Sequence, residues 1–420
     1  MMNLKNRILF LFRSLKKYGL RGVVDLLLDL DMRLKKSFSR RNELLGTMRR
    51  SDPERGLTLV GEFRGGGSLS KVMRDLAKQL KKAGSPYQTL DKTKESPVPP
   101  CEYDGILTPT DGFCANKYTK ILAMQGDFPS IDRRCDKYAI HFWEFEDGFK
   151  EFMPDVYKER NVLAFSDFNR EVFRKELPGS INVRKVLYPF QFDSRAMVPK
   201  PVVRENMGIG IDDFVVFFSF SFGTSAYRKN PEGVVRAFAK SLGREKDAKI
   251  VFKTSCSERC AKQYDKLRGL VSGLGLGEKV VFVNEYISQD ALVSLTNACD
   301  AYVSLHRGEG FGLGIVEAMY LGLPVVVSDY SAVREFCNKD NSIPISYRRI
   351  VPDSEAIDHV GYKNVKTWIE PDEDEAAQAL RRLYDDENLR KELGLNAQRF
   401  VKEYFSIQNF KDSIDRFLDD

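Results

Sequence analysis

The stretch "HRGEGFGLGIVEAMYLGLPVVVSD", residues 306–329, decides the fold of this chain. Glu309 and Glu317 bracket glycines at every second position. The apolar run "AYVSL" (301–305) precedes the stretch, and the apolar "PVVVS" closes it. Apolar runs of this length are typical of strands buried on both faces of a parallel sheet. The pattern therefore predicts a strand, a glycine-rich loop, a helix beginning near Gly312, and a second strand.

The glycines also give the loop a chemical property. They leave backbone N–H groups uncovered at the start of the helix, where the helix dipole places about half a positive elementary charge. Such a helix end binds anions and suits a diphosphate. A carboxylate accepts hydrogen bonds from paired hydroxyls, so Glu309 in the loop fits a sugar and Glu317, one turn into the helix, fits a ribose. The motif predicts a nucleotide-sugar site. The alternative is a buried strand–turn–helix whose glycines only allow close packing.

Strand-like and helix-like segments alternate over the rest of the chain, which indicates an α/β protein with parallel sheets. The alternation begins at "GLTLVGEF" (56–63) and restarts at "DFVVFFSFSF" (213–222). Residues 193–206, with two prolines and no periodicity, are predicted to be a linker. A chain of 420 residues is expected to form two domains. We predict two Rossmann-like, doubly wound domains that face each other across a cleft: residues 51–195 and 205–390, followed by a C-terminal helix, 391–420, able to pack back on the N-terminal domain.

Residues 1–50 hold the excess of positive charge. They contain 13 lysines and arginines against four acidic residues, whereas the whole chain has a net charge of only +6. Apolar residues recur at helical spacing between Leu20 and Leu34, so the segment is expected to be a basic amphipathic helix. Two interpretations stay open: the helix rests on an anionic membrane surface, or it packs on its own domain. Because the other residues carry no positive excess, no nucleic-acid partner is expected.

The rest of the composition is typical of a soluble cytoplasmic protein. The chain is 42% hydrophobic and 30% charged, and its seven cysteines form no CxxC pairs. The apolar run near the start, Ile8–Phe12, is shorter than the roughly 7–15 residues of a secretory signal. No stretch approaches the ~20 apolar residues that cross a bilayer. We expect a cytoplasmic protein, peripheral to the inner face of the plasma membrane if residues 1–50 bind there.

Several segments together resemble the signature of retaining glycosyltransferase family 4. These are the Glu309-x7-Glu317 spacing with "AMYLGLPVVVSD", "FSFSFGTSAYRKNPEGVVRAF" (218–238), "IVFKTS" (250–255) and "WIEPDEDEAAQALR" (368–381). The resemblance covers most of residues 205–405. It is looser over 51–190, where it rests on "GGGSLSKVMRDLAKQL" and "YAIHFWEFED". One departure is "YSAVREFC" (330–337), where related members usually carry a glycine after the serine. The resemblance implies the GT-B fold.

The resemblance also implies roles for the donor-site residues. Glu309 would be a catalytic residue that holds the hydroxyls of the transferred sugar, and Glu317 would hold the ribose. The charge of the departing diphosphate would be stabilised by fixed cations and a helix N-terminus without a metal or other cofactor. The two Asp-x-Asp pairs, 29–31 in the amphipathic helix and 372–374 in an acidic C-terminal run, are not expected to bind metal. The other implied donor-binding residues are Gly310, Phe311, Gly312, Leu313, Gly314, Arg228, Lys229 and Lys253.

On the acceptor side, two segments of the N-terminal domain are candidates. The glycine loop near residues 65–70 offers Gly66, Gly67 and Ser68. In the second segment, Trp143 is predicted to stack on an acceptor sugar, and His141 or Glu144 to orient the attacking hydroxyl. The alternative for the histidine is a purely structural role.

The expected function is transfer of a sugar, with retained configuration, from a nucleotide-diphosphate-sugar to a hydroxyl of a glycan. The basic N-terminal segment favours a lipid-linked acceptor in synthesis of bacterial cell-envelope polysaccharide. The alternatives on the same fold are a nucleotide-sugar epimerase, a phosphorylase, or a non-catalytic protein that binds nucleotide-sugar. The residues specify neither the base nor the sugar of the donor.

Overall fold

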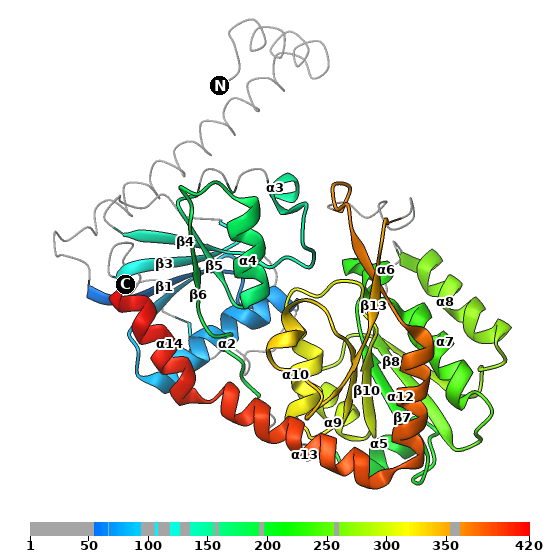
Figure 1. Cartoon of the computed structure of the whole chain (residues 1–420). Coiled ribbons are helices and arrows are strands. Elements are labelled where there is room, and N and C mark those ends of the chain that lie inside the picture. The colour runs from blue at the N-terminus through cyan, green and yellow to red at the C-terminus, as the bar shows by residue number, and fades with distance from the viewer. Residues whose placement is uncertain are drawn as a thin grey trace, which may run out of the picture.

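The computed structural model describes two α/β domains, each built on a parallel six-stranded sheet (Figure 1). The two sheets were predicted, and their doubly wound arrangement is confirmed. Residues 1–50, predicted to be helical, lie outside the described part. The described residues are 54–65, 67–93, 106–107, 118–126, 135–153, 156, 159–192, 197–255, 260–352 and 362–420.

The N-terminal sheet has the strand order β2-β1-β3-β4-β5-β6. This is the order of flavodoxin-like sheets, with the change of direction between β1 and β3. Helix α2 follows β1 through the glycine loop. The elements are β1 Glu54–Gly61, α2 Ser68–Ala83, β2 Tyr87–Asp91, β3 Tyr118–Met124, β4 Asp136–Ile140, α3 Phe149–Phe152, β5 Asn161–Ala164, α4 Asp167–Glu176 and β6 Asn182–Lys185.

The C-terminal sheet has the order β12-β11-β10-β7-β8-β9, which is the dinucleotide-binding Rossmann order. Its change of direction lies between β7 and β10, which pair in parallel. In open α/β sheets, ligands bind outside the carboxyl ends of strands at this point. The elements are β7 Phe214–Ser219, α6 Ala226–Lys229, α7 Pro231–Leu242, β8 Ala248–Thr254, α8 Ala261–Gly273, β9 Val280–Asn284, α9 Gln289–Asn297, β10 Ala301–Ser304, α10 Leu313–Tyr320, β11 Val325–Ser328 and β12 Ile343–Ile345.

The core of the C-terminal domain follows from its apolar strands. The first five residues of β7 are buried, as is the whole of β10. Helix α7 covers this sheet and begins at a defined cap. Asn230 adopts a left-handed conformation, and its side chain accepts a hydrogen bond from Gly233 N, while Pro231 occupies the first helical position. The sequence "KNPEG" thus directs the chain out of α6 and into α7.

The expected linker is partly helical. Residues 193–206 were predicted to be irregular, but α5 runs from Lys200 to Asn206. The prolines that suggested a linker lie at the cap and within the first turn of α5, where a missing N–H costs nothing. The buried Arg204 side chain fixes this helix by donating to Ala298 O (2.8 Å) and to Asp300 Oδ2 (2.6 Å).

The C-terminal helices connect the two domains. Helices α12 (Glu373–Asp385) and α13 (Glu387–Tyr404) lie along the C-terminal domain, and α14 (Ile407–Asp419) packs on α2 of the N-terminal domain (Figure 1). Arg55 pairs with Asp415 and Asp419 of α14 at 3.2 and 2.9 Å. Within the described part of the chain, every helix is too short or too polar to traverse a lipid bilayer.

A small antiparallel hairpin, β13 (Tyr347–Ile350) with β14 (Trp368–Pro371), was not predicted. It belongs to a hydrophobic cluster that contains residues of both domains. Phe145 of the N-terminal domain contacts Trp368 with ring centroids 4.4 Å apart, and Tyr362 with centroids 5.1 Å apart. This aromatic contact holds the two domains against each other beside the predicted site.

Candidate functional site

The predicted strand, glycine loop and helix are present at the change of direction in the C-terminal sheet. Strand β10 ends at Ser304 and α10 begins at Leu313, as expected. Gly312 has φ +98°, and a Cβ there would lie 2.8 Å from Val333 Cγ1, so only glycine fits. A Cβ on Gly314 would lie 2.7 Å from Tyr302 Oη. These two glycines let the start of α10 pack tightly against Val333 and against Tyr302 of β10.

Glu309 lies in this loop among cations. Its carboxylate pairs with the Lys229 ammonium and lies 3.9 Å from Arg228 Nη1. Its other oxygen accepts from Gly312 N (3.2 Å) and, at 3.5 Å, from Phe311 N. Burial opposes the charge, but Lys229 and Arg228 outweigh it and lower the pKa of Glu309 to about 2. Glu309 is therefore ionised at neutral pH.

The first turn of α10 keeps backbone donors available. Glu309 takes up the N–H groups of Phe311 and Gly312, while Ile315 N and Val316 N donate to Gly312 O. The N–H groups of Leu313 and Gly314 donate to no acceptor among the described residues. They are the two groups predicted to bind a diphosphate, and they point from a helix N-terminus.

Arg228 and Lys229 reach the loop from α6, the short helix after β7. Arg228 Nη1 donates to Gly308 O (2.7 Å), and Arg228 Nη2 lies 3.7 Å from Glu144 Oε1 of the N-terminal domain. Burial lowers the pKa of Lys229, although Glu309 opposes this shift. Burial raises the pKa of Glu144, and the Arg228 charge counters it. Two cations and two carboxylates thus meet where the domains touch.

Lys253 is the penultimate residue of β8 and lies at the same edge of the sheet. Its Nζ donates to Thr254 O at 3.1 Å. Burial lowers the pKa of Lys253, and the charge of Glu285 partly offsets this shift. Among the described residues no carboxylate pairs with Lys253, so its ammonium is available for a phosphate contact.

Glu317 lies one turn into α10 and has a different environment. Its Oε1 accepts from Gln289 Nε2 at 3.2 Å and lies 3.9 Å from Lys71 Nζ. Burial raises the pKa of Glu317, and Lys71 only partly offsets this. Sequence reasoning missed Lys71 and Gln289. The only feature of the sequence that could have pointed to Lys71 is its place four residues after Gly67, a glycine of the predicted acceptor loop.

Phe311 and Gly310 bring the loop against the N-terminal domain. The Phe311 ring stacks on Tyr188 with centroids 3.7 Å apart. A Cβ on Gly310 would lie 3.4 Å from Phe142 Cβ, and one on Gly308 would lie 2.8 Å from Phe145 Cε1. The site is therefore made of residues from both domains.

Of the three residues predicted around position 143, only Glu144 faces the site. His141 is 2% exposed and lies in hydrogen-bonding distance of Glu159, Nε2 to Oε2, at 3.2 Å. Trp143 is fully buried, and its Nε1 donates to Asp147 O (2.8 Å). The predicted stacking of Trp143 on an acceptor sugar is not possible in this arrangement, because the aromatic residues of the interdomain cluster cover its ring.

The N-terminal glycine loop leads into α2. Gly66 lies outside the described residues, whereas Gly67 caps α2 and Ser68 is its first residue, both exposed. A Cβ on Gly67 would meet nothing within 4 Å. Arg74 holds the loop by donating to Phe63 O (2.7 Å) and Gly65 O (2.8 Å).

The described residues contain no cluster of three or more His, Cys, Asp or Glu residues able to hold a metal. Of the two Asp-x-Asp pairs, 29–31 lies outside the described part. Asp372 caps α12 by accepting from Asp374 N and Glu375 N, both at 2.9 Å. Asp374 pairs with Lys240 at 2.7 Å. The second pair thus has a structural role.

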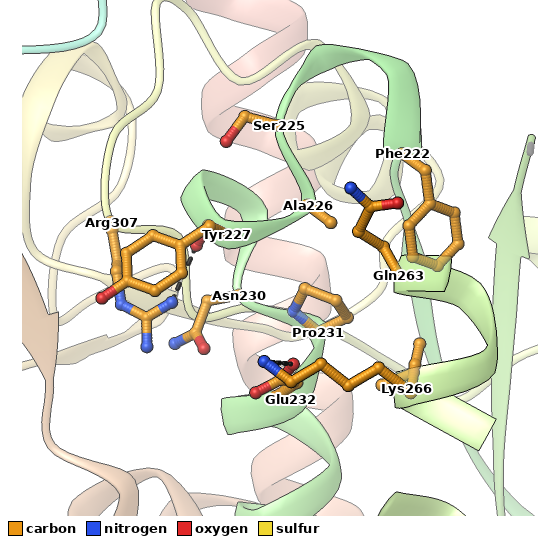
Figure 2. A pocket seen from close by; sticks show the side chains of 11 residues that line it. Phe222, Ser225, Ala226, Tyr227, Asn230, Pro231, Glu232, Gln263, Lys266 and Arg307 are labelled. Carbon is orange, nitrogen blue, oxygen red and sulfur yellow. Dashed lines mark hydrogen bonds and ion pairs between the residues drawn. The ribbon is translucent and has the colours of Figure 1, made fainter. Parts of the chain in front are cut away.

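A cavity of about 270 Å³ lies on another side of α6 (Figure 2). Neither Glu309 nor Glu317 lines it. Arg307 closes one end, where it donates to Tyr227 O (2.7 Å) and lies over the Tyr227 ring. Its guanidinium also makes two 2.9 Å bonds with Glu370. The Arg307 side chain is thus already paired.

Known proteins resemble this chain in sequence. Residues 216–400 match the family described as glycosyl transferases group 1. An uncharacterized glycosyltransferase of Methanocaldococcus jannaschii is 28% identical over 65% of this chain and 61% of its own length. A human alpha-1,3/1,6-mannosyltransferase is 24% identical over 61% of this chain and 58% of its own length. The chain thus spans less than two thirds of these relatives.

Solved structures resemble the chain over most of its length. Anabaena HepE in complex with UDP and glucose superposes with a TM-score of 0.58 and 14% identity, covering 87% of this chain and all of that one. Sucrose-phosphate synthase from Thermosynechococcus elongatus gives 0.60 and 15%, covering 87% and 98%. At these identities the likeness establishes the fold, and the predicted GT-B architecture is confirmed.

Proposed function

The chain belongs, through residues 216–400, to the group 1 glycosyl transferases, and on that premise we propose that it transfers a sugar from a nucleoside diphosphate to an acceptor hydroxyl. One observation carries the proposal: two largely buried glutamates flank free backbone donors and cations where the two domains meet. We expect the anomeric configuration to be retained, as the family resemblance implies.

The leaving group is the part of the reaction that the site fits best. Departure of a nucleoside diphosphate builds negative charge on the phosphate oxygens. The N–H groups of Leu313 and Gly314 lie at the positive end of α10, and Lys253 makes no ion pair with a described residue. Donors fixed before the reaction stabilise developing charge without reorganising, which is the largest contribution in many enzymes.

Glu309 provides the complementary group for the sugar. It stays ionised because Lys229 and Arg228 hold its pKa near 2. An ionised carboxylate accepts hydrogen bonds from two adjacent sugar hydroxyls and does not compete for the phosphate end. Glu144 lies beside Arg228 on the acceptor side, where it can orient the attacking hydroxyl.

We propose a UDP-sugar as donor and a hexose as the transferred group. The first choice draws on Anabaena HepE, which was solved with UDP and glucose, and the second on the mannosyltransferase among the relatives. For the acceptor we propose a lipid-linked glycan of the bacterial cell envelope, met at an anionic membrane surface through residues 1–50. Co-sedimentation with anionic vesicles, with and without those residues, tests the membrane contact; equal binding would contradict it.

The test of the function is release of nucleoside diphosphate from a panel of UDP- and GDP-sugars, with and without glycan acceptors. The proposal expects release that depends on the acceptor and a sugar–acceptor product visible by mass spectrometry. Turnover of the donor alone into an epimer would favour the epimerase alternative. Donor binding without any turnover over a broad acceptor panel would favour the non-catalytic alternative.

A further inference from the structure

Lys71 of the N-terminal domain reaches the ribose side of the donor site. It lies in the first turn of α2, directly after the glycine loop. Its Nζ donates to Asp75 Oδ2 (2.7 Å) and to Gln191 O (3.4 Å), and lies 3.9 Å from Glu317 Oε1. The Lys71 side chain is 15% exposed and that of Glu317 is 12% exposed. A cation of one domain thus meets a carboxylate of the other in a largely buried space.

Lys71 is the cation on which Glu317 depends. Two carboxylates, Asp75 and Glu317, share its ammonium, whereas Asp75 also feels the charges of Lys78 and Arg74 on its own helix. Among the described residues, the other groups that interact with Glu317 are neutral: the Gln289 amide on α9 and the hydroxyls of Tyr188 and Tyr302. Burying an unpaired carboxylate is costly, so without the ammonium one of the two acids would take up a proton.

We propose that Lys71 is a positioning residue of the ribose subsite: it keeps Glu317 ionised and oriented so that both ribose hydroxyls donate to this carboxylate. The inference rests on the proposed function and adds an N-terminal-domain residue to the nucleotide site. It follows that the ribose subsite is complete only when α2 lies against α10. A protonated Glu317 would offer one acceptor oxygen fewer and a hydroxyl donor in its place.

Helix α2 does not depend on Lys71 for its place. Gln79 Nε2 donates to Phe190 O (2.6 Å), Arg74 holds the preceding loop, and α14 packs along the helix. Variants at Lys71 are therefore expected to fold. Lys82, an exposed lysine at the end of the same helix, provides a matched control.

The experiment measures affinity for a UDP-sugar and for its 2′,3′-dideoxyribose analogue between pH 5 and 8, by calorimetry on the full chain. A UDP-sugar is chosen because its diphosphate has no proton to lose in this range. The proteins are the unmodified chain, Lys71→Met, Lys71→Arg and Lys82→Met. We expect Lys71→Met to weaken the ribonucleotide about tenfold while leaving the dideoxy analogue unchanged. In Lys71→Met, the loss of UDP-sugar affinity at acid pH should also begin at higher pH, because without the ammonium Glu317 and Asp75 share a proton.

Lys71→Arg should restore most of the discrimination between the two ligands, and Lys82→Met should behave like the unmodified chain. An unchanged ratio of the two affinities in Lys71→Met would overturn the inference, as would an equal loss for both ligands. If the unmodified chain binds no nucleotide-sugar of the panel, the proposed function fails instead. Asp75→Asn is a second test: it frees Lys71 for Glu317, so ribonucleotide affinity should rise, and unchanged affinity would count against the inference.

Discussion

Glu309 and Glu317 are two carboxylates of the same burial in opposite electrostatic settings. Each side chain is 12% exposed, yet the pKa of Glu309 is lowered to about 2 and that of Glu317 is raised. Glu309 has two cations of its own domain, whereas Glu317 shares one cation from the other domain with a second acid. The sugar end of the site is thus preformed within the C-terminal domain, and the ribose end depends on the meeting of two domains.

Replacing Glu309 by Gln should have the largest effect on turnover, because it removes the charge that distinguishes Glu309 from a neutral side chain. The amide keeps the size of the side chain but loses the ion pair with Lys229 and one acceptor oxygen. We expect donor turnover to fall about 10²–10³-fold, the usual loss for a preorganised electrostatic contact. Nucleoside diphosphate release measures it, with the exposed Glu392→Gln as the matched control. Activity within threefold of the unmodified chain would count against the assigned role.

Arg228→Met should destabilise the fold by about 3 kcal/mol, because it leaves Glu144 and Glu309 buried with one cation. The direction in which stability changes with pH follows from the lowered pKa of Glu309. Its contribution to stability is present above the unfolded value of roughly 4.3 and is lost as the pH falls through about 2. In Arg228→Met this loss should begin at higher pH. Denaturant unfolding between pH 2 and 7 measures both effects; coincident curves for the two proteins would refute the cation's role.

Glu317→Gln should act on affinity more than on turnover. We expect nucleotide-sugar binding at pH 8 to weaken about tenfold. The raised pKa of Glu317 means that its ionised form is lost as the pH falls, so affinity of the unmodified chain should decline on the acid side. The Gln variant should lack this decline, and the two should converge at low pH. A constant ratio from pH 5 to 8 would show that Glu317 does not titrate in the complex.

Arg349→Ala should have the smallest effect. It compares an exposed interdomain ion pair with the largely buried contact between Lys71 and Glu317. Arg349 also pairs across the domains, with Glu146 at 2.8 Å, but the two side chains are 56% and 38% exposed. Exposed pairs contribute about 0–1 kcal/mol. Donor affinity and the unfolding midpoint should stay within error of the unmodified chain. A tenfold loss of affinity would mean that any interdomain contact, buried or not, governs the site.

The sequence predicted what short-range spacing determines. Alternating apolar runs specify the two sheets, and Gly312 and Glu317 specify a helix that begins at the loop. Spacing could not place Lys71 or Trp143, because tertiary packing decides both. Lys71 meets Glu317 only when the domains come together. Trp143 packs against Tyr362, which lies more than 200 residues away, in a cluster that also contains Trp368. Pro199 and Pro201 led to the wrong prediction of an irregular linker, since prolines also occur at the start of helices.

A crystal structure of the chain with a bound UDP-sugar tests the central claim most directly. We predict diphosphate oxygens within hydrogen-bonding distance of Leu313 N and Gly314 N, sugar hydroxyls on Glu309, and ribose hydroxyls on Glu317 beside Lys71. A nucleotide seated elsewhere, for instance in the cavity between Tyr227 and Lys266, with the start of α10 empty, would contradict this account.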